Sequence, residues 1–167
     1  AYVTHEVETP SPEYRAIPNL TFHPIRQSRS LRRAATYASR LARGVPSSAC
    51  RGLGPELIAV AERLAEQPGR GRIVAGDEIA AGALWEVAGR RPVIYNAHNI
   101  EYELERSPLA RAHMRAFERR LLGRMAESWM VSRRDIATAR ELCPGARLRY
   151  VPNVVDVTAI TPVTPAG

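Results

Sequence analysis

Residues 72–98 read RIVAGDEIAAGALWEVAGRRPVIYNAH, and this stretch decides the fold. It opens with a short apolar run at 72–75, continues with a helical pattern at 78–88, and closes with a second apolar run at 92–97. Short apolar runs bounded by Gly, Pro and polar residues are typical of buried strands. Because a helix joins the two runs, the stretch predicts a strand, helix, strand unit with parallel strands.

The same alternation continues on both sides of this unit. Towards the carboxyl end we expect a helix from Pro108 to Met125, a strand at 129–131, a helix at 133–142 and a strand at 148–151. The amino-terminal part predicts strands at 2–7 and 20–25, a helix capped by Ser28 with an apolar stripe from Leu31 to Val45, and a helix at 55–65. This order predicts an α/β fold, a doubly wound and mostly parallel sheet with helices on both faces.

Length and composition fit one globular domain. The 167 residues are 45% apolar and 25% charged, and we expect a Rossmann-like domain over 1–153, followed by a Thr, Pro and Val-rich linker at 154–167. Cys50 and Cys143 stand far apart without zinc-ligand spacing, so neither a disulfide framework nor a metal site is predicted, and no cofactor is expected. Apolar runs stay below the ~18 residues that cross a bilayer, which predicts a soluble, cytoplasmic protein.

The charge is unevenly distributed. The formal net charge is +7, every basic residue is arginine, and no acid lies between Tyr14 and Pro55. One face of the expected helix carries Arg29, Arg33, Arg40 and Arg43, while its alanine-rich face is expected to pack on the sheet. The arginine face is therefore a candidate contact for an anionic acceptor or the inner face of a membrane, although a solvated face is the more common explanation.

Polar residues follow four successive predicted strands. Ligands of open α/β sheets bind beyond the carboxyl ends of the strands, so these residues are candidates for a site at one edge. They are Asp77, His98, Asn99, Glu101, Ser132 and Asn153.

Each of these candidates has a structural alternative. Ser132 and Asp135 have the spacing of a capping box, Asp77 can cap the helix after it, and Asn153 can be a turn residue. His98 is the strongest candidate because an imidazole can donate, accept or titrate near neutral pH. The sequence lacks the G-x-S-x-G, G-x-G-x-x-G and P-loop patterns, which argues against an esterase, a dinucleotide-binding enzyme and a P-loop NTPase.

Three ordered landmarks resemble a known family. They are RPVIYNAHNIEYELER at 91–106, AESWMVS at 126–132 and YVPNVVD at 150–156. Together they resemble the N-terminal domain of bacterial family-four retaining glycosyltransferases of the GT-B fold. The likeness departs from the family pattern at Val154, where glycine is usual, and at Glu127, where aspartate is usual.

The resemblance implies a metal-independent glycosyltransferase that moves a sugar from a nucleotide-diphosphate donor to a glycan or lipid-linked acceptor. By position, His98 would hydrogen-bond the donor sugar as the catalytic residue. Asp77, Asn99, Glu101 and Ser132 would shape the substrate rim, and Asn153 would begin the hinge to a C-terminal nucleotide-sugar domain. The family's first strand with its glycine-rich loop and this second domain are expected outside these residues, so we expect the chain alone to be inactive.

The alternative function is a non-catalytic basic module. In this interpretation the helix from Arg26 to Arg43 binds nucleic acid or another polyanion. Only 6% of the residues are aromatic, and no helix-turn-helix or stacking platform is visible, which disfavours nucleic acid as the partner.

Overall fold

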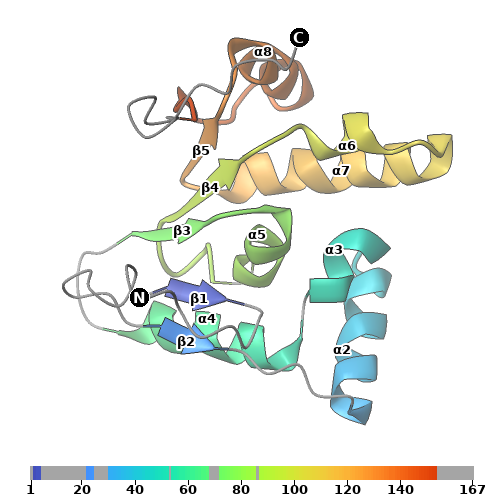
Figure 1. Cartoon of the computed structure of the whole chain (residues 1–167), viewed down its shortest axis with the longest axis vertical. Helices are drawn as coiled ribbons and strands as arrows, with labels where there is room; N and C mark the ends of the chain where they lie inside the picture. Colours follow the sequence, from blue (N-terminus) through green and yellow to red (C-terminus); the bar gives the residue numbers. More distant parts are fainter. Residues whose placement is uncertain are drawn as a thin grey trace, which may run out of the picture.

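The architecture is a parallel four-stranded sheet with helices between the strands. A computed structural model describes residues 2–4, 22–24, 30–52, 54–67, 72–85 and 87–153. The sheet has the order β3-β4-β5-β6, with all neighbours parallel, and β1 and β2 form a separate parallel pair (Figure 1). The strands are β1 (Tyr2–Thr4), β2 (Phe22–Pro24), β3 (Ile73–Ala75), β4 (Val93–Ala97), β5 (Glu127–Met130) and β6 (Leu148–Tyr150). The predicted α/β class with a parallel sheet is therefore confirmed.

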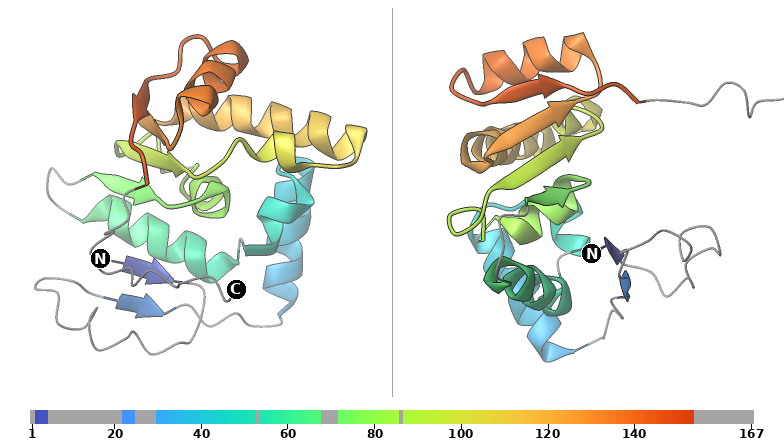
Figure 2. Two further views of the ribbon diagram at one scale, coloured as in Figure 1. Left: turned by 45° about the horizontal axis from the view of Figure 1, so that its top comes forward. Right: turned by 90° about the vertical axis from the view of Figure 1, so that its left-hand side faces the viewer.

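Seven helices belong to the described residues, and Figure 2 shows them alongside the strands, with α8 at the top of both views. They are α2 (Leu31–Ala42), α3 (Ser47–Gly52), α4 (Pro55–Glu66), α5 (Glu78–Leu84), α6 (Glu101–Leu104), α7 (Pro108–Arg124) and α8 (Arg133–Leu142). Helix α5 contacts β3 and β4, and α8 contacts β5 and β6, as expected for crossovers between neighbouring parallel strands.

Several helices begin where the sequence predicts. The Asp77 carboxylate accepts a hydrogen bond from the Ala80 amide at 2.6 Å, and the Ser132 hydroxyl accepts one from the Asp135 amide at 3.0 Å. Both contacts satisfy an amide that the first helical turn leaves without an intrahelical partner. The capping role of these residues is confirmed. Pro55 lies in the first turn of α4, as predicted.

Helix α7 supplies the centre of the core. Its residues Met114, Phe117 and Leu121 are buried, and they belong to one apolar cluster with Tyr95 of β4 and Met130 of β5. This is the stripe that the helical periodicity predicts, and it anchors α7 under the sheet.

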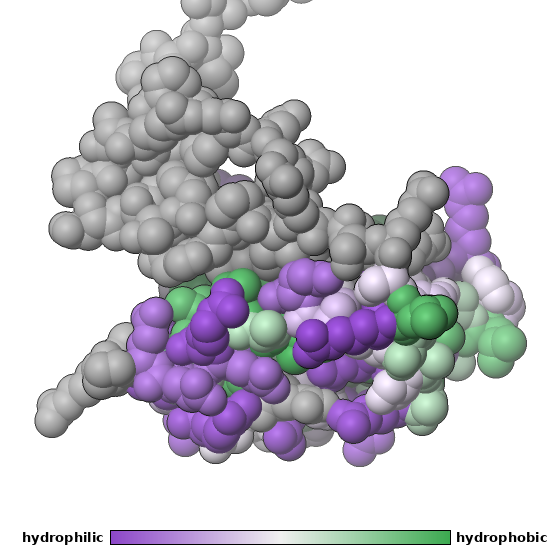
Figure 3. Space-filling model, turned by 90° about the horizontal axis from the view of Figure 1, so that it is seen from below, coloured by the Kyte–Doolittle hydropathy of each residue, from purple (hydrophilic) through white to green (hydrophobic). Residues whose placement is uncertain are grey.

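Helix α2 buries the face opposite to the one that the sequence predicts. Leu31 is 91% exposed and Leu41 is 37% exposed, and the four alanines on the same face are exposed as well. The buried side instead contains Arg40, which is 6% exposed, and Tyr37, which packs against the core. Seen from below in Figure 3, hydrophobic side chains gather at the end of the molecule where α2 lies. The prediction that the alanine-rich face packs on the sheet is wrong, because α2 packs on α3 and α4.

The end of α2 is held by α7. Gly44 follows the helix with φ of +74°, a backbone conformation that glycine adopts without steric cost. The Arg120 guanidinium of α7 donates to the Arg43 carbonyl at 3.0 Å and also to the Gly44 carbonyl. The last carbonyls of a helix lack intrahelical partners, so Arg120 serves as a C-terminal cap from a distant part of the chain.

Other element predictions are corrected in detail. The cap of α2 is Ser30, whose hydroxyl accepts from the Arg33 amide at 3.2 Å, and Ser28 lies outside the described residues. The helix at 78–88 ends at Leu84, and the strand at 129–131 spans Glu127–Met130. Helices α3 and α6 are not predicted by the sequence, because each is too short to show a helical period. The expected linker at 154–167 also lies outside the described residues.

Candidate functional site

The four strands of the sheet end in one row. Ala75 pairs with Tyr95, Ala97 pairs with Met130, and Met130 pairs with Tyr150. Since all four strands are parallel, the residues that follow them leave the sheet at the same carboxyl edge. This edge therefore receives Asp77, His98, Asn99, Ser132 and Asn153.

The turn after β4 presents two exposed polar side chains. Ala97 is buried at the end of β4, whereas His98 and Asn99 are exposed. The Asn96 amide nitrogen lies 3.4 Å from His98 Nε2, so a side chain of the strand contacts the imidazole. An exposed imidazole with one polar neighbour remains free to bind a ligand through its other ring nitrogen.

Three of the predicted site residues influence the pKa of the Glu101 carboxyl. Partial burial raises the pKa of the Glu101 carboxyl above its ordinary value of 4.5, a hydrogen bond with the Asn99 side chain lowers it, and the carboxylates of Asp77 and Glu105 raise it. The His98 imidazole lowers the pKa of Glu101 further. Four residues therefore influence the protonation of Glu101: Asn99, Asp77, Glu105 and His98. The protonation of Glu101 thus depends on residues that follow both β3 and β4.

Glu118 holds this turn in place from α7. Its side chain is 2% exposed, and its two carboxylate oxygens accept hydrogen bonds from the backbone amides of Glu101 and Tyr102, each at 2.9 Å. Residue Ile100 stands at the N-cap of α6 and contributes no side-chain hydrogen bond. Glu118 therefore satisfies the free amides of α6 that a local cap would normally satisfy.

The sequence contains a signal for Glu118 that lies outside the pattern of polar residues at strand ends. Glu118 stands four residues after Met114 and three before Leu121, which places an acid on the apolar stripe of a helix. A charged residue at such a position is rarely buried without a partner. The amides of a turn without a local capping side chain are the partners that such an acid can satisfy.

Two predicted site residues are placed at the edge without joining this group. Ser132 bonds to Asp135, with its hydroxyl 2.6 Å from the Asp135 carboxylate, and Asn153 is exposed after β6. Within 87–153 no hydrogen bond connects either residue to His98, Asn99 or Glu101. Ser132 and Asn153 therefore lie at the same edge as His98 without a hydrogen bond to it.

The predicted arginines of α2 do not form one exposed face. Arg40 is buried, Arg33 is half-buried, Arg43 is exposed, and Arg29 lies outside the described residues. The prediction that these arginines form one exposed face is therefore wrong for Arg40. Arg32 and Arg43 are the exposed arginines of this helix and its cap, and they flank the apolar face.

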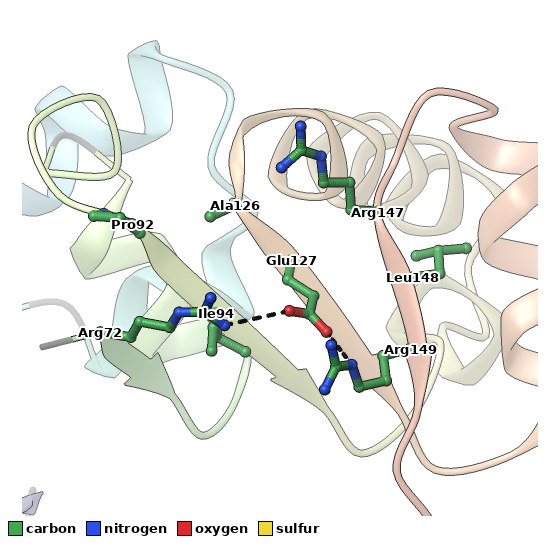
Figure 4. Close-up of a pocket in the computed structure, with 8 residues that line it drawn as sticks. All are labelled: Arg72, Pro92, Ile94, Ala126, Glu127, Arg147, Leu148 and Arg149. Atoms are coloured by element: carbon green, nitrogen blue, oxygen red, sulfur yellow. Dashed lines mark ion pairs between the residues drawn. The ribbon is translucent and has the colours of Figure 1, made fainter.

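A hollow lies near the starts of the strands, at the end of the sheet opposite to His98 (Figure 4). It has a volume of about 660 Å³ and is lined by Arg72, Pro92, Ile94, Ala126, Glu127, Arg147, Leu148 and Arg149. These residues stand at or just before the starts of β3 to β6. The sequence does not predict this hollow, because the rule for open α/β sheets directs attention to the carboxyl ends of the strands.

The described residues meet neither the requirements of a membrane span nor those of a metal site. No helix of the described residues is both long and apolar enough to cross a membrane. Within the same residues, no group of three or more His, Cys, Asp or Glu side chains is arranged to hold a metal ion.

The site and the sheet define a Rossmann-like parallel α/β domain with polar residues at the carboxyl edge. Comparisons with protein-family models, with curated proteins and with solved structures find no match to this chain.

Proposed function

We propose that the chain is the acceptor-side domain of a retaining glycosyltransferase that uses a nucleotide-diphosphate sugar. The observation that carries this proposal is the row of polar residues at the carboxyl edge of the sheet, where His98 and Asn99 are exposed after β4 and the Asn96 amide nitrogen lies 3.4 Å from His98 Nε2. Ligands of open α/β sheets bind at this edge. The three sequence landmarks of the resemblance each run to or beyond the carboxyl end of one strand: β4, β5 and β6.

In the proposed reaction, His98 donates a hydrogen bond to the donor sugar, while Asn99 and Glu101 shape the pocket around it. The chemistry is stabilisation of an oxocarbenium-like transition state and of the leaving diphosphate. Glu118 contributes indirectly, because its two hydrogen bonds fix the backbone that carries these groups. The resemblance implies that a second domain holds the nucleotide.

The test uses the protein encoded by the whole reading frame and compares two histidines. His98→Ala is expected to slow nucleotide-sugar hydrolysis and transfer about 100-fold, the effect of removing one preorganised donor. His113, exposed on α7, provides the matched control, and His113→Ala should leave the rate unchanged. A change within about twofold for His98→Ala would remove the catalytic role assigned to it.

We further propose that α2 contacts an anionic membrane surface. The exposed face with Leu31 and Leu41 is the observation that favours this contact, and Arg32 and Arg43 flank it. Apolar side chains enter the interface while each arginine near an anionic surface contributes ~1 kcal/mol. This replaces the predicted contact through Arg40, whose side chain is buried.

Vesicle sedimentation tests the membrane contact. The chain should sediment with vesicles that contain phosphatidylglycerol and should remain in solution with pure phosphatidylcholine. The double variant Leu31→Gln and Leu41→Gln should lose most of this binding, whereas the same substitution of Leu109, which is exposed on α7, should not. Equal binding by both variants would exclude α2 as the contact, and binding to DNA instead would favour the basic-module alternative.

A further inference from the structure

The hollow near the starts of the strands has the dimensions of a small-molecule site. Its volume of about 660 Å³ lies within the ~300–1,000 Å³ that ligand pockets occupy. Strands β4, β5 and β6 contribute residues to it, and Arg72 directly precedes β3, so its lining is built on rigid elements. The Arg147 carbonyl accepts a hydrogen bond from the Ser128 amide at 2.8 Å, which fixes the backbone of Arg147 against β5.

Three arginines and one glutamate line this hollow, and in Figure 4 Arg72 and Arg149 point toward Glu127 whereas Arg147 lies apart from them. The Glu127 carboxylate lies 3.7 Å from Arg72 and forms a closer ion pair with Arg149. It also accepts a hydrogen bond from the Trp129 indole at 3.2 Å, and its side chain is only 15% exposed. One carboxylate thus divides its charge between two arginines.

Arg147 adds a further positive charge to the hollow. No hydrogen bond or ion pair with the part of the chain that the structure describes engages its guanidinium, and Figure 4 shows it pointing away from Glu127. With Glu127 as the single acid of the lining, the hollow carries an excess of positive charge. A concave surface with excess positive charge concentrates anions.

The rest of the lining is apolar. Ile94 is buried beneath the arginines, and Pro92, Ala126 and Leu148 complete the walls. Apolar walls with a few converging charged groups are the usual composition of a pocket for an organic ligand. The lining therefore suits an anion that has a carbon body.

We propose that this hollow binds the phosphate group of a phosphorylated small molecule. Guanidinium groups match phosphate oxygens through paired N–H donors, and Arg147 is the donor that is free to do so. Arg72 and Arg149 can share their remaining N–H groups between Glu127 and the ligand, because both side chains are more than half exposed. This site is separate from the proposed glycosyltransferase site, since it lies near the opposite ends of the strands.

Calorimetric titration of the chain with inorganic pyrophosphate and with glucose 6-phosphate tests this proposal at constant ionic strength. Arg147→Gln should weaken binding about tenfold, the effect of losing one charge-assisted contact. Arg140, exposed on α8, gives the matched control. Arg140→Gln lowers the net charge by the same amount, so a site-specific effect appears as a difference between these two variants.

A second pair of variants tests the same site in the other direction. Glu127→Gln releases Arg72 and Arg149 from their ion pairs, so it should tighten binding of both probes. Glu141→Gln on exposed α8 changes the net charge equally and should have a smaller effect. His98→Ala should leave binding unchanged, so failure of the glycosyltransferase proposal does not affect this result.

Three outcomes would overturn the proposal. The first is the absence of saturable binding of either probe at millimolar concentration. The second is an equal loss of affinity in Arg147→Gln and Arg140→Gln, which would indicate nonspecific attraction. The third is equally tight binding of citrate with the same response to Arg147→Gln, which would assign the site to carboxylates.

Discussion

Helices α2 and α7 are both basic and amphipathic, yet they bury opposite faces. Helix α7 buries its apolar stripe, with Phe117 and Leu121 in the core, and leaves most of its arginines exposed. Helix α2 buries Arg40 and leaves Leu31 and Leu41 exposed. The amphipathic period therefore predicts that a helix has two faces, but neighbouring elements decide which face is covered.

Each of the two helices also buries one charged side chain. Glu118 of α7 is satisfied by two backbone amides of the turn that carries His98 and Glu101. Arg40 of α2 lies near the buried Cys50 thiol, since burial raises the pKa of Cys50 and Arg40 lowers it. A buried charge is stable only where partners surround it, so both helices are fixed by contacts that periodicity does not reveal.

The largest expected effect is the difference in stability loss when a leucine is removed from the apolar face of α7 or of α2. Leu121→Ala should lower the free energy of unfolding by about 3 kcal/mol, because it leaves a cavity in the core. Leu31→Ala should change it by less than about 0.5 kcal/mol, since the side chain is exposed. Urea denaturation measures both values. Similar losses in the two variants would mean that α2 packs through its leucines.

Arg40→Ala tests the unusual buried face of α2. We expect a loss of about 2 kcal/mol in the free energy of unfolding, because the substitution leaves buried partners unsatisfied and opens a cavity. The neighbouring exposed Arg32 is the control, and Arg32→Ala should change stability by less than about 0.5 kcal/mol. Equal small effects would place Arg40 in solvent and restore the predicted arginine face.

The contact between the two helices is tested at Gly44. Gly44→Ala should destabilise the protein by about 1–2 kcal/mol, because alanine is strained at positive φ. The added Cβ would also lie 2.8 Å from the Arg120 guanidinium that caps α2. Gly145→Ala is the control, since nothing lies within 4 Å of a Cβ at that position. Thermal unfolding measures both variants. An equal decrease of the unfolding temperature in the two would contradict the capping of α2 by Arg120.

The smallest expected effect concerns Glu101, which lies in the turn that Glu118 of α7 holds. This residue should change how the free energy of unfolding depends on pH. The pKa of Glu101 is raised by burial, so its contribution to folding is complete below pH 4.5 and is lost as the pH rises through the raised pKa. Glu101→Gln should flatten this part of the stability profile and leave the rest unchanged. Glu141→Gln should keep the wild-type profile, and a wild-type profile in both variants would show that Glu101 is solvated.

Local patterns were sufficient to predict much of the fold. Helix α8 has the predicted bounds, and β4, α7 and β6 differ by one residue, because apolar runs, capping residues and Pro108 mark their ends. The row of polar residues after the strands follows from parallel strand order alone. These features depend on residues close together in the sequence.

The features that the sequence did not predict all depend on distant partners. The cap that Glu118 provides for α6 and the arginine-lined hollow each join separate elements. The leucines of α2 are exposed because the other side of this helix packs on α3 and α4. Which face of a helix is buried also depends on the elements that pack against it. A single sequence contains the residues for these contacts, but it does not contain their pairing.

The bond from Arg120 to the Arg43 carbonyl spans 77 residues of chain. At ~5–20 residues per second, a ribosome adds that length in several seconds, so α2 emerges long before the residue that closes its end. During this interval the leucines and arginines of this segment are exposed, and the Arg43 carbonyl still lacks its bond from Arg120. Any surface that recognises α2 can therefore reach it on the nascent polypeptide, before the domain has closed around α7.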